Sequence, residues 1–381
     1  MSTPPDPQSP FGPQRAGEPP QPREPLDFGD LTPDPGSADQ ALELFESLLL
    51  IAASAPLEGD LSSHPLTVAQ AAKAMIGLRP DAPSSAMVGV AMEVCRDIQW
   101  SAPDIAALSG KPEQLGLTVS VHDFEAALAA GDAPAAQAQL ARLLMVSDSR
   151  QYLFDILLDQ AARDPRRAPA LLPFVHSCQR AYDFSGTLNF ADFILPAIAA
   201  VAADQQVAPP ATAEPVTVWD VLDRLHTGPP ELLLLAAHTA QIMADEHIKG
   251  PALAGRLGRT LAALAAELPT APFDKRRVTP ASAPAIATAT ATTKWSSSDL
   301  LAAARAGEAE RCGAIGRQLA ETGERVWLLE LLEAAGEITP PLLLWGDAVR
   351  MLLRVAPESE RGVVGEVAGA QLAGTLSDHE K

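Results

Sequence analysis

Histidines are the residues of this sequence best suited to chemistry. Four of them fall inside predicted helices, and these are His64, His176, His238 and His247. A neutral imidazole can ligate a transition metal, and an imidazole that titrates near neutral pH can transfer protons. We therefore take these four histidines as candidate metal ligands. The sequence assigns no catalytic residue and no cofactor.

The positions of these histidines also fit a simpler interpretation. His238 and His247 are nine residues apart, so at about 100° per residue they would point to opposite faces of one straight helix. His247 lies in the last turn before Gly250, where the helix dipole favours a cation, and His64 lies at a helix start. Capping and surface roles would explain both residues. A metal site would instead need histidines from different helices to converge.

The helices that must position these residues follow a pattern that occurs twice, at 123–160 and at 299–335. Each copy predicts a helix, a tight turn, a second helix, another turn and a third helix. A glycine follows the first helix of each copy, where a residue with positive φ is needed to end it. The aligned pairs include Asp123 with Asp299, Gly131 with Gly307, and Tyr152 with Trp327. The repetition predicts a tandem duplication.

Composition predicts an all-α protein. Hydrophobic residues make up 47% of the chain and aromatic residues only 4%, and long alternating β-branched runs are absent. We expect two similar multi-helix halves behind a disordered, proline-rich N-terminal tail. The predicted segments are a tail at 1–37, a first half at 38–204, a linker at 205–215, and a second half at 216–376 with a mobile Pro/Ala/Thr loop at 269–295.

The duplication relates candidate residues in the two halves. His64 corresponds to His247 with a shift of one position, and His176 aligns with Asp347. If the halves pack face to face, these polar groups could reach a shared cleft. Such a cluster could bind a metal ion or take part in proton transfer.

Charge and cysteine content limit the partners and the compartment. The net charge of −20 argues against nonspecific nucleic-acid binding and against docking on anionic membranes. The longest apolar run, 193–203, is too short to span a bilayer, and no signal peptide is visible. The three separated cysteines form no CxxC pair. We expect a cytoplasmic protein with buried cysteines and a protein partner.

One stretch resembles a known family. A short helix, Ala130-Gly131-Asp132-Ala133, a second helix, the segment 153–164 and a helix that carries His176 follow one another. This order resembles the helical repeats of questin-oxidase-like proteins. The resemblance implies a helical-repeat fold and oxygen-dependent ring cleavage of aromatic polyketides.

Two functional hypotheses follow. The first is a non-catalytic interaction or scaffold protein that binds a partner protein or a small ligand between its two halves. The alternative is a questin-oxidase-like or metal-binding oxidoreductase that uses histidines in the cleft between the halves. The sequence leaves open whether the chain is an enzyme.

Overall fold

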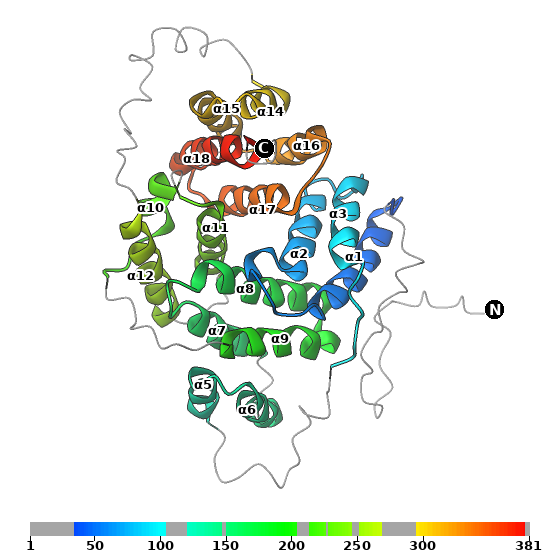
Figure 1. Cartoon of the computed structure of the whole chain (residues 1–381), viewed down its shortest axis with the longest axis vertical. Coiled ribbons are helices and arrows are strands. Elements are labelled where there is room, and N and C mark those ends of the chain that lie inside the picture. The colour runs from blue at the N-terminus through cyan, green and yellow to red at the C-terminus, as the bar shows by residue number, and fades with distance from the viewer. Residues whose placement is uncertain are drawn as a thin grey trace, which may run out of the picture.

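The computed structural model describes residues 34–103, 120–146, 150–203, 213–225, 228–245, 251–268 and 295–377, and within these ranges it is all-helical with no strand (Figure 1). The helices are α1 (Ala38–Ala53), α2 (Pro65–Ile76), α3 (Ser85–Cys95), α5 (Val121–Ala129), α6 (Ala133–Val146), α7 (Arg150–Ala161), α8 (Ala168–Ser185), α9 (Phe190–Ala202), α10 (Val218–Leu225), α11 (Pro230–Ala244), α12 (Pro251–Glu267), α14 (Ser297–Arg305), α15 (Ala309–Glu321), α16 (Val326–Ala335), α17 (Pro340–Val355) and α18 (Glu358–Ser377). Short 3₁₀ turns, η2 (Leu61–Ser63) and η4 (Thr187–Asn189), precede α2 and α9.

Local capping chemistry sets several helix starts. Ser37 accepts the backbone N–H of Gln40 at the start of α1. Ser296 and Asp299 form a reciprocal capping box at the start of α14. At α2, proline occupies the first turn and the preceding residue, His64, caps the helix with its side chain. The start of α2 confirms the capping role that the sequence indicates for His64.

Four helices form a closed ring at the centre of the molecule. Helix α2 packs against α8, α8 against α11, α11 against α17, and α17 against α2. Figure 1 shows these four helices in the middle, with α1 and α3 beside α2 and with α7 and α9 beyond α8. One hydrophobic cluster runs through the ring and into the surrounding helices. Helices far apart in the chain therefore share a single core.

A second tight contact joins α15 to α18. A Cβ atom added at Gly316 would overlap the carbonyl oxygen of Gly365, and one added at Gly369 would overlap that of Cys312. Only glycine permits two helix backbones to approach this closely. Arg317 of α15 also pairs with Glu366 of α18. The glycines therefore fix the distance between these helices.

The two predicted repeat copies share their turn but differ in their surroundings. Gly131 has φ 73° and Gly307 has φ 70°, as predicted for both turns. The alignment of Tyr152 with Trp327 also predicts equivalent packing for the two side chains. Tyr152, however, is 47% exposed whereas Trp327 is 6% exposed, so this prediction is wrong. The copies lie at opposite ends of the molecule (Figure 1). Helix α15 has α18 as a neighbour, and α6 has α9 instead. The tandem duplication stays a prediction.

Several other predictions concern the surface and the termini. The N-terminal tail up to residue 33, most of the linker, and the loop 269–294 lie outside the described residues.

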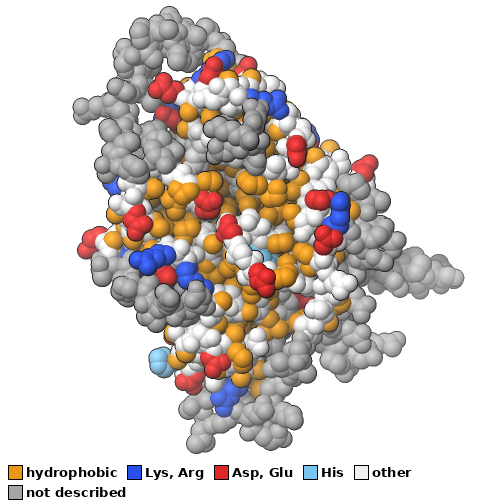
Figure 2. Space-filling model, in the orientation of Figure 1, with side chains coloured by type: hydrophobic (Ala, Val, Ile, Leu, Met, Phe, Trp, Pro, Cys, Tyr) orange, Lys and Arg blue, Asp and Glu red, His pale blue; other side chains and the backbone are white. Residues whose placement is uncertain are grey.

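Among the helices that the structure describes, none is long and apolar enough to cross a membrane. Cys95, Cys178 and Cys312 are buried free thiols, as expected. On the face shown in Figure 2, hydrophobic side chains gather across the middle, and charged side chains are dispersed among and around them.

Candidate functional site

A cavity of about 490 Å³ opens beside the four-helix ring. Residues of α1, α2, α8, α11 and α17 line it, so both predicted halves of the chain contribute to its wall. Cavities of roughly 300–1,000 Å³ are typical of small-molecule sites. The cavity is therefore large enough for a small organic ligand.

The floor of the cavity is a buried ion network. Asp347 of α17 accepts hydrogen bonds from Arg350 on the same helix, with Nε to Oδ1 at 2.7 Å, and from Arg180 of α8, with Nη1 to Oδ2 at 3.2 Å. The side chains of these three residues are between 2% and 12% exposed. Burial alone would raise the pKa of Asp347, but the two guanidinium groups outweigh burial and leave its pKa lowered. Asp347 is therefore ionised and holds both arginines in place.

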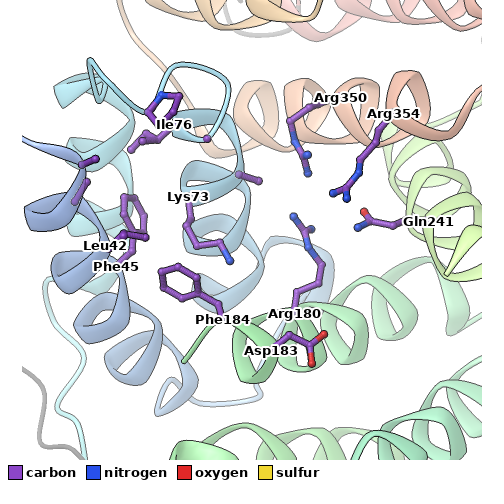
Figure 3. A pocket seen from close by; sticks show the side chains of 15 residues that line it. Leu42, Phe45, Lys73, Ile76, Arg180, Asp183, Phe184, Gln241, Arg350 and Arg354 are labelled. Atoms are coloured by element: carbon purple, nitrogen blue, oxygen red, sulfur yellow. The ribbon is translucent and has the colours of Figure 1, made fainter. Parts of the chain in front are cut away.

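Lys73 of α2 extends from the opposite wall toward these arginines (Figure 3). Its Nζ lies 4.1 Å from the centre of the Phe184 ring, a cation–π distance. Burial is the main cause that lowers the pKa of Lys73 to about 7, and the positive charge of Arg180 lowers it further. Lys73 is thus only partly protonated near neutral pH.

The remaining polar side chains that line the cavity are Arg354, Gln241 and Asp183. Arg354 lies one turn beyond Arg350 on α17, and Gln241 points in from α11 (Figure 3). Arg350 and Arg354 both act to lower the pKa of Arg180, after burial as the largest cause. Asp183, the acidic residue of the lining, lies on the far side of Arg180 from Arg350 and Arg354 (Figure 3). Among the described residues, those that line the cavity therefore include four basic side chains and one carboxylate.

The other side of the cavity is apolar. Leu42 and Phe45 of α1, Ile76 of α2 and Phe184 of α8 contribute side chains to it. Leu42 is 49% exposed, which is unusual for a leucine next to a core, whereas Phe45 is buried. An apolar wall that faces clustered cations suits a ligand with a hydrophobic body and an anionic group.

The structure brings two of the four predicted histidines together. His176 of α8 and His238 of α11 are buried, and their Nδ1 atoms lie 2.8 Å apart. One neutral ring donates its Nδ1–H and the other accepts it, because two protonated rings would repel each other. Burial lowers the pKa of both residues well below the usual value, and the charge of His238 adds to this effect at His176. Asp347, which the alignment pairs with His176, acts on the same ring electrostatically.

The other two histidines have different positions. The Nδ1 atom of His64 accepts the backbone N–H of Leu66 at 3.2 Å, which is the capping role. Its ring also packs edge-on against Phe174, with centroids 4.7 Å apart. Burial lowers the pKa of His64 to about 4, although backbone hydrogen bonds of Ala55 and Pro56 oppose the shift. His247 lies outside the described residues, so the predicted convergence of His64 with His247 stays a prediction.

The described residues do not by themselves supply a complete metal site. His176 and His238 could offer two imidazole ligands. Across the described ranges, no group of three or more His, Cys, Asp or Glu side chains is placed to hold an ion. Protein metal sites usually use three or four such ligands. A site built on the predicted histidines would need a contribution from His247.

Reasoning from histidines missed the cationic cavity, but the sequence contained a signal for it. Polar residues recur at a spacing of three or four within otherwise apolar helices, which places them on one helix face. The series are Gln70 and Lys73 in α2, His176 and Arg180 in α8, His238 and Gln241 in α11, and Asp347, Arg350 and Arg354 in α17. When a buried helix face carries a row of polar residues, these residues must contact polar residues of other helices, because buried polar groups need hydrogen-bond partners.

Comparison of this chain with family models, with curated proteins and with solved structures found no match. The functional assignment therefore depends on the cavity itself.

Proposed function

We propose that this protein is a non-catalytic helical binding protein that holds a small organic anion between its two halves. The observation that carries the proposal is the cavity lined by Lys73, Arg180, Arg350 and Arg354 on one side and by apolar side chains on the other. The ligand that suits it carries a carboxylate group on an apolar body.

The charge distribution supports this ligand class. The chain as a whole has a net charge of −20, yet four basic side chains gather in one cavity. Asp347 neutralises part of this charge because it pairs with Arg180 and Arg350. The cationic excess that remains would be relieved by a bound carboxylate, which accepts charge-assisted hydrogen bonds from guanidinium groups.

Binding of decanoate to the full-length protein tests the proposal. Titration calorimetry should detect binding of decanoate at one site, and neither decanol nor decyltrimethylammonium should bind comparably. Arg354→Gln should weaken decanoate binding about 10- to 100-fold, because a hydrogen bond to a charged group contributes about 1.5–3 kcal/mol. Arg354 is exposed and makes no contact with Asp347 that the structure describes, so this substitution should leave the fold intact.

Arg311→Gln provides the matched control. Arg311 is also an exposed arginine on a helix, but it pairs with Glu308 and lies outside the cavity. Its substitution should leave decanoate affinity unchanged. Equal losses in the two variants, or equal affinity for decanoate and decanol, would contradict an anion site in this cavity.

The alternative, a questin-oxidase-like or metal-binding oxidoreductase, is favoured by the buried contact between His176 and His238. A metal analysis of the purified full-length protein tests it. Stoichiometric zinc, iron or copper that is lost in a His176→Ala, His238→Ala double variant would favour the alternative. Equal metal content in that variant and the parent would favour the binding protein.

A further inference from the structure

Lys73 differs from Arg180 and Arg350 because, within the described residues, it makes no ion pair or hydrogen bond with a carboxylate. Asp347 bonds to Arg180 and Arg350, but within the described residues the amine of Lys73 makes only a contact with the face of Phe184. It is also the one lysine that the described ranges contain. A primary amine thus lies in the wall of the cavity, opposite clustered guanidinium groups (Figure 3).

We propose that Lys73 forms a Schiff base with the carbonyl group of an anionic aldehyde or ketone that the cavity binds. This inference rests on the proposed function, and it adds a carbonyl group to the chemistry of the ligand. The acid group of the ligand would lie against Arg350 and Arg354, and its carbonyl carbon would face the Lys73 amine. The apolar wall would cover the remainder of the ligand.

The reaction needs no oxidant, reductant or cofactor. The neutral amine attacks the carbonyl carbon, a C–N bond forms, and the carbonyl oxygen becomes the hydroxyl of a carbinolamine. The hydroxyl group takes up the proton that the ammonium group released and leaves as water, which gives a protonated imine. Over the whole reaction, one ammonium group and one carbonyl group give one iminium group and one water molecule. The positive charge is kept, so the interaction with a nearby carboxylate is kept as well.

The surroundings of Lys73 favour the reactive, neutral amine. An unperturbed lysine with a pKa of about 10.4 is less than about 0.1% neutral at pH 7. The pKa of Lys73, at about 7, leaves about half of it neutral at that pH. Arg180 and Asp183 of α8 and Asp347 and Arg350 of α17 are the charged groups that act on it. The two arginines lower its pKa, the two aspartates oppose them, and burial exceeds all four.

Reductive labelling of the full-length protein tests the proposal. The protein is incubated with 4-carboxybenzaldehyde and cyanoborohydride at pH 7, and peptide mass spectrometry then locates the modified amines. Lys73 should be labelled at least tenfold faster than the five other lysines, which serve as internal references. The references are Lys111, Lys249, Lys275, Lys294 and Lys381.

Two controls separate recognition from reactivity. Benzaldehyde lacks the carboxylate, so it should label Lys73 several-fold more slowly than 4-carboxybenzaldehyde does. Excess decanoate should slow the labelling of Lys73 but not that of the reference lysines. Lys73→Arg removes the nucleophilic amine, so the variant should lose the label at this position.

The outcomes distinguish this inference from the proposed function. If decanoate binds but Lys73 is labelled no faster than the reference lysines, the Schiff base is overturned and the binding function stands. If Lys73 is labelled selectively but decanoate does not bind, the reactive amine stands and the proposed ligand class fails. If neither result is obtained, both fail. The labelling of the parent protein decides the question even if Lys73→Arg does not fold.

Discussion

At the scale of single residues, Asp347 stabilises the buried guanidinium groups that line the cavity. Its carboxylate is the shared partner of Arg180 and Arg350, and all three side chains are largely buried. Asp347→Ala leaves two buried guanidinium groups without their anion, so we expect it to lower the free energy of unfolding by about 3–5 kcal/mol. Urea denaturation followed by circular dichroism measures this change.

An exposed ion pair supplies the comparison for Asp347. Glu308 and Arg311 are also three residues apart, at the start of α15, but both side chains are nearly half exposed. Glu308→Ala should therefore cost less than about 1 kcal/mol. Similar losses in the two variants would show that Asp347 does not stabilise buried cations.

Lys73 should make anion binding depend on pH. Because its pKa in the free protein is about 7, Lys73 gains a proton as the pH falls through 7, and the cavity then carries one more positive charge. Decanoate should bind about tenfold more tightly at pH 6 than at pH 8.5. Lys73→Met should remove this difference, since methionine carries no titratable group. A pH dependence that persists in Lys73→Met would assign it to another group.

His64 should make the fold sensitive to acid. Its pKa falls from 6.5 to about 4 on folding, so the unfolded chain binds the proton more readily. The stability that His64 confers is complete above about pH 6.5 and is lost as the pH falls toward 4. At pH 4.5 the loss is about 2–3 kcal/mol.

His64→Asn isolates this contribution, because asparagine also caps helix starts but does not titrate. The unfolding free energy of the variant should fall about 2–3 kcal/mol less than that of the parent between pH 7.5 and 4.5. Loss of the Phe174 contact lowers its stability at every pH and does not alter this difference. Parallel pH curves for the two proteins would refute the assignment.

The sequence identified individual residues well where their role is local. The cap at His64 and the positive φ at Gly131 and Gly307 follow from residue type and from the residues beside them. The partners of Arg180 and Lys73 come from helices more than 100 residues away, so no local pattern identifies them. Histidines drew attention because they are rare, whereas arginines and lysines usually lie on the surface.

At the scale of helices, the contact between α15 and α18 shows how glycine sets an interhelical distance. Gly316→Ala would place a methyl group against the backbone of Gly365, which cannot move without separating the helices. We expect it to lower the free energy of unfolding by about 1–3 kcal/mol, the usual cost of overpacking. Thermal denaturation measures this loss.

Gly374 provides a control within α18 itself. A Cβ atom added there meets nothing within 4 Å, so Gly374→Ala should stabilise the protein by about 0.5–1 kcal/mol through helix propensity. The two Gly→Ala variants should thus change the melting temperature in opposite directions. Changes of the same sign would contradict the close-contact interpretation.

The positions of helices can be predicted because the signals that start, continue and end a helix lie within the helix and the residues beside it. Apolar spacing and end signals predict three helices in 123–160 and three in 299–335, and these are observed as α5, α6 and α7 and as α14, α15 and α16. Helix partners were not predictable, since alanine- and leucine-rich faces fit many neighbours equally well. The unequal burial of Tyr152 and Trp327 shows that tertiary contacts could not be predicted in this way, because similar helices pack against different neighbours.

At the scale of the whole molecule, the ring of α2, α8, α11 and α17 joins the two ends of the chain. Two of its helices precede residue 204 and two follow residue 213. A fragment that ends within 204–212 would leave apolar faces of α2 and α8 uncovered. It should therefore unfold at lower urea concentration than the full chain and bind a hydrophobic dye.

Co-expression of the two parts of the chain tests whether their contact restores stability. The fragment and the remainder of the chain should copurify as a complex that restores the parent's resistance to urea. A first fragment that is as stable alone as in the full chain would show that the predicted halves are independent domains. The segment boundaries at 204 and 216 could be proposed from composition, but the shared core could not.

The clustered cations of the cavity also have a kinetic consequence. An anion that approaches from afar meets a molecule of net charge −20 and is repelled, whereas at contact it meets four basic side chains. Raising the ionic strength from about 0.01 M to 0.15 M shortens the Debye length from about 30 Å to about 8 Å, which screens the distant repulsion far more than the contact. Salt should therefore accelerate the entry of the ligand, which is the reverse of its effect on an anion site in a basic protein.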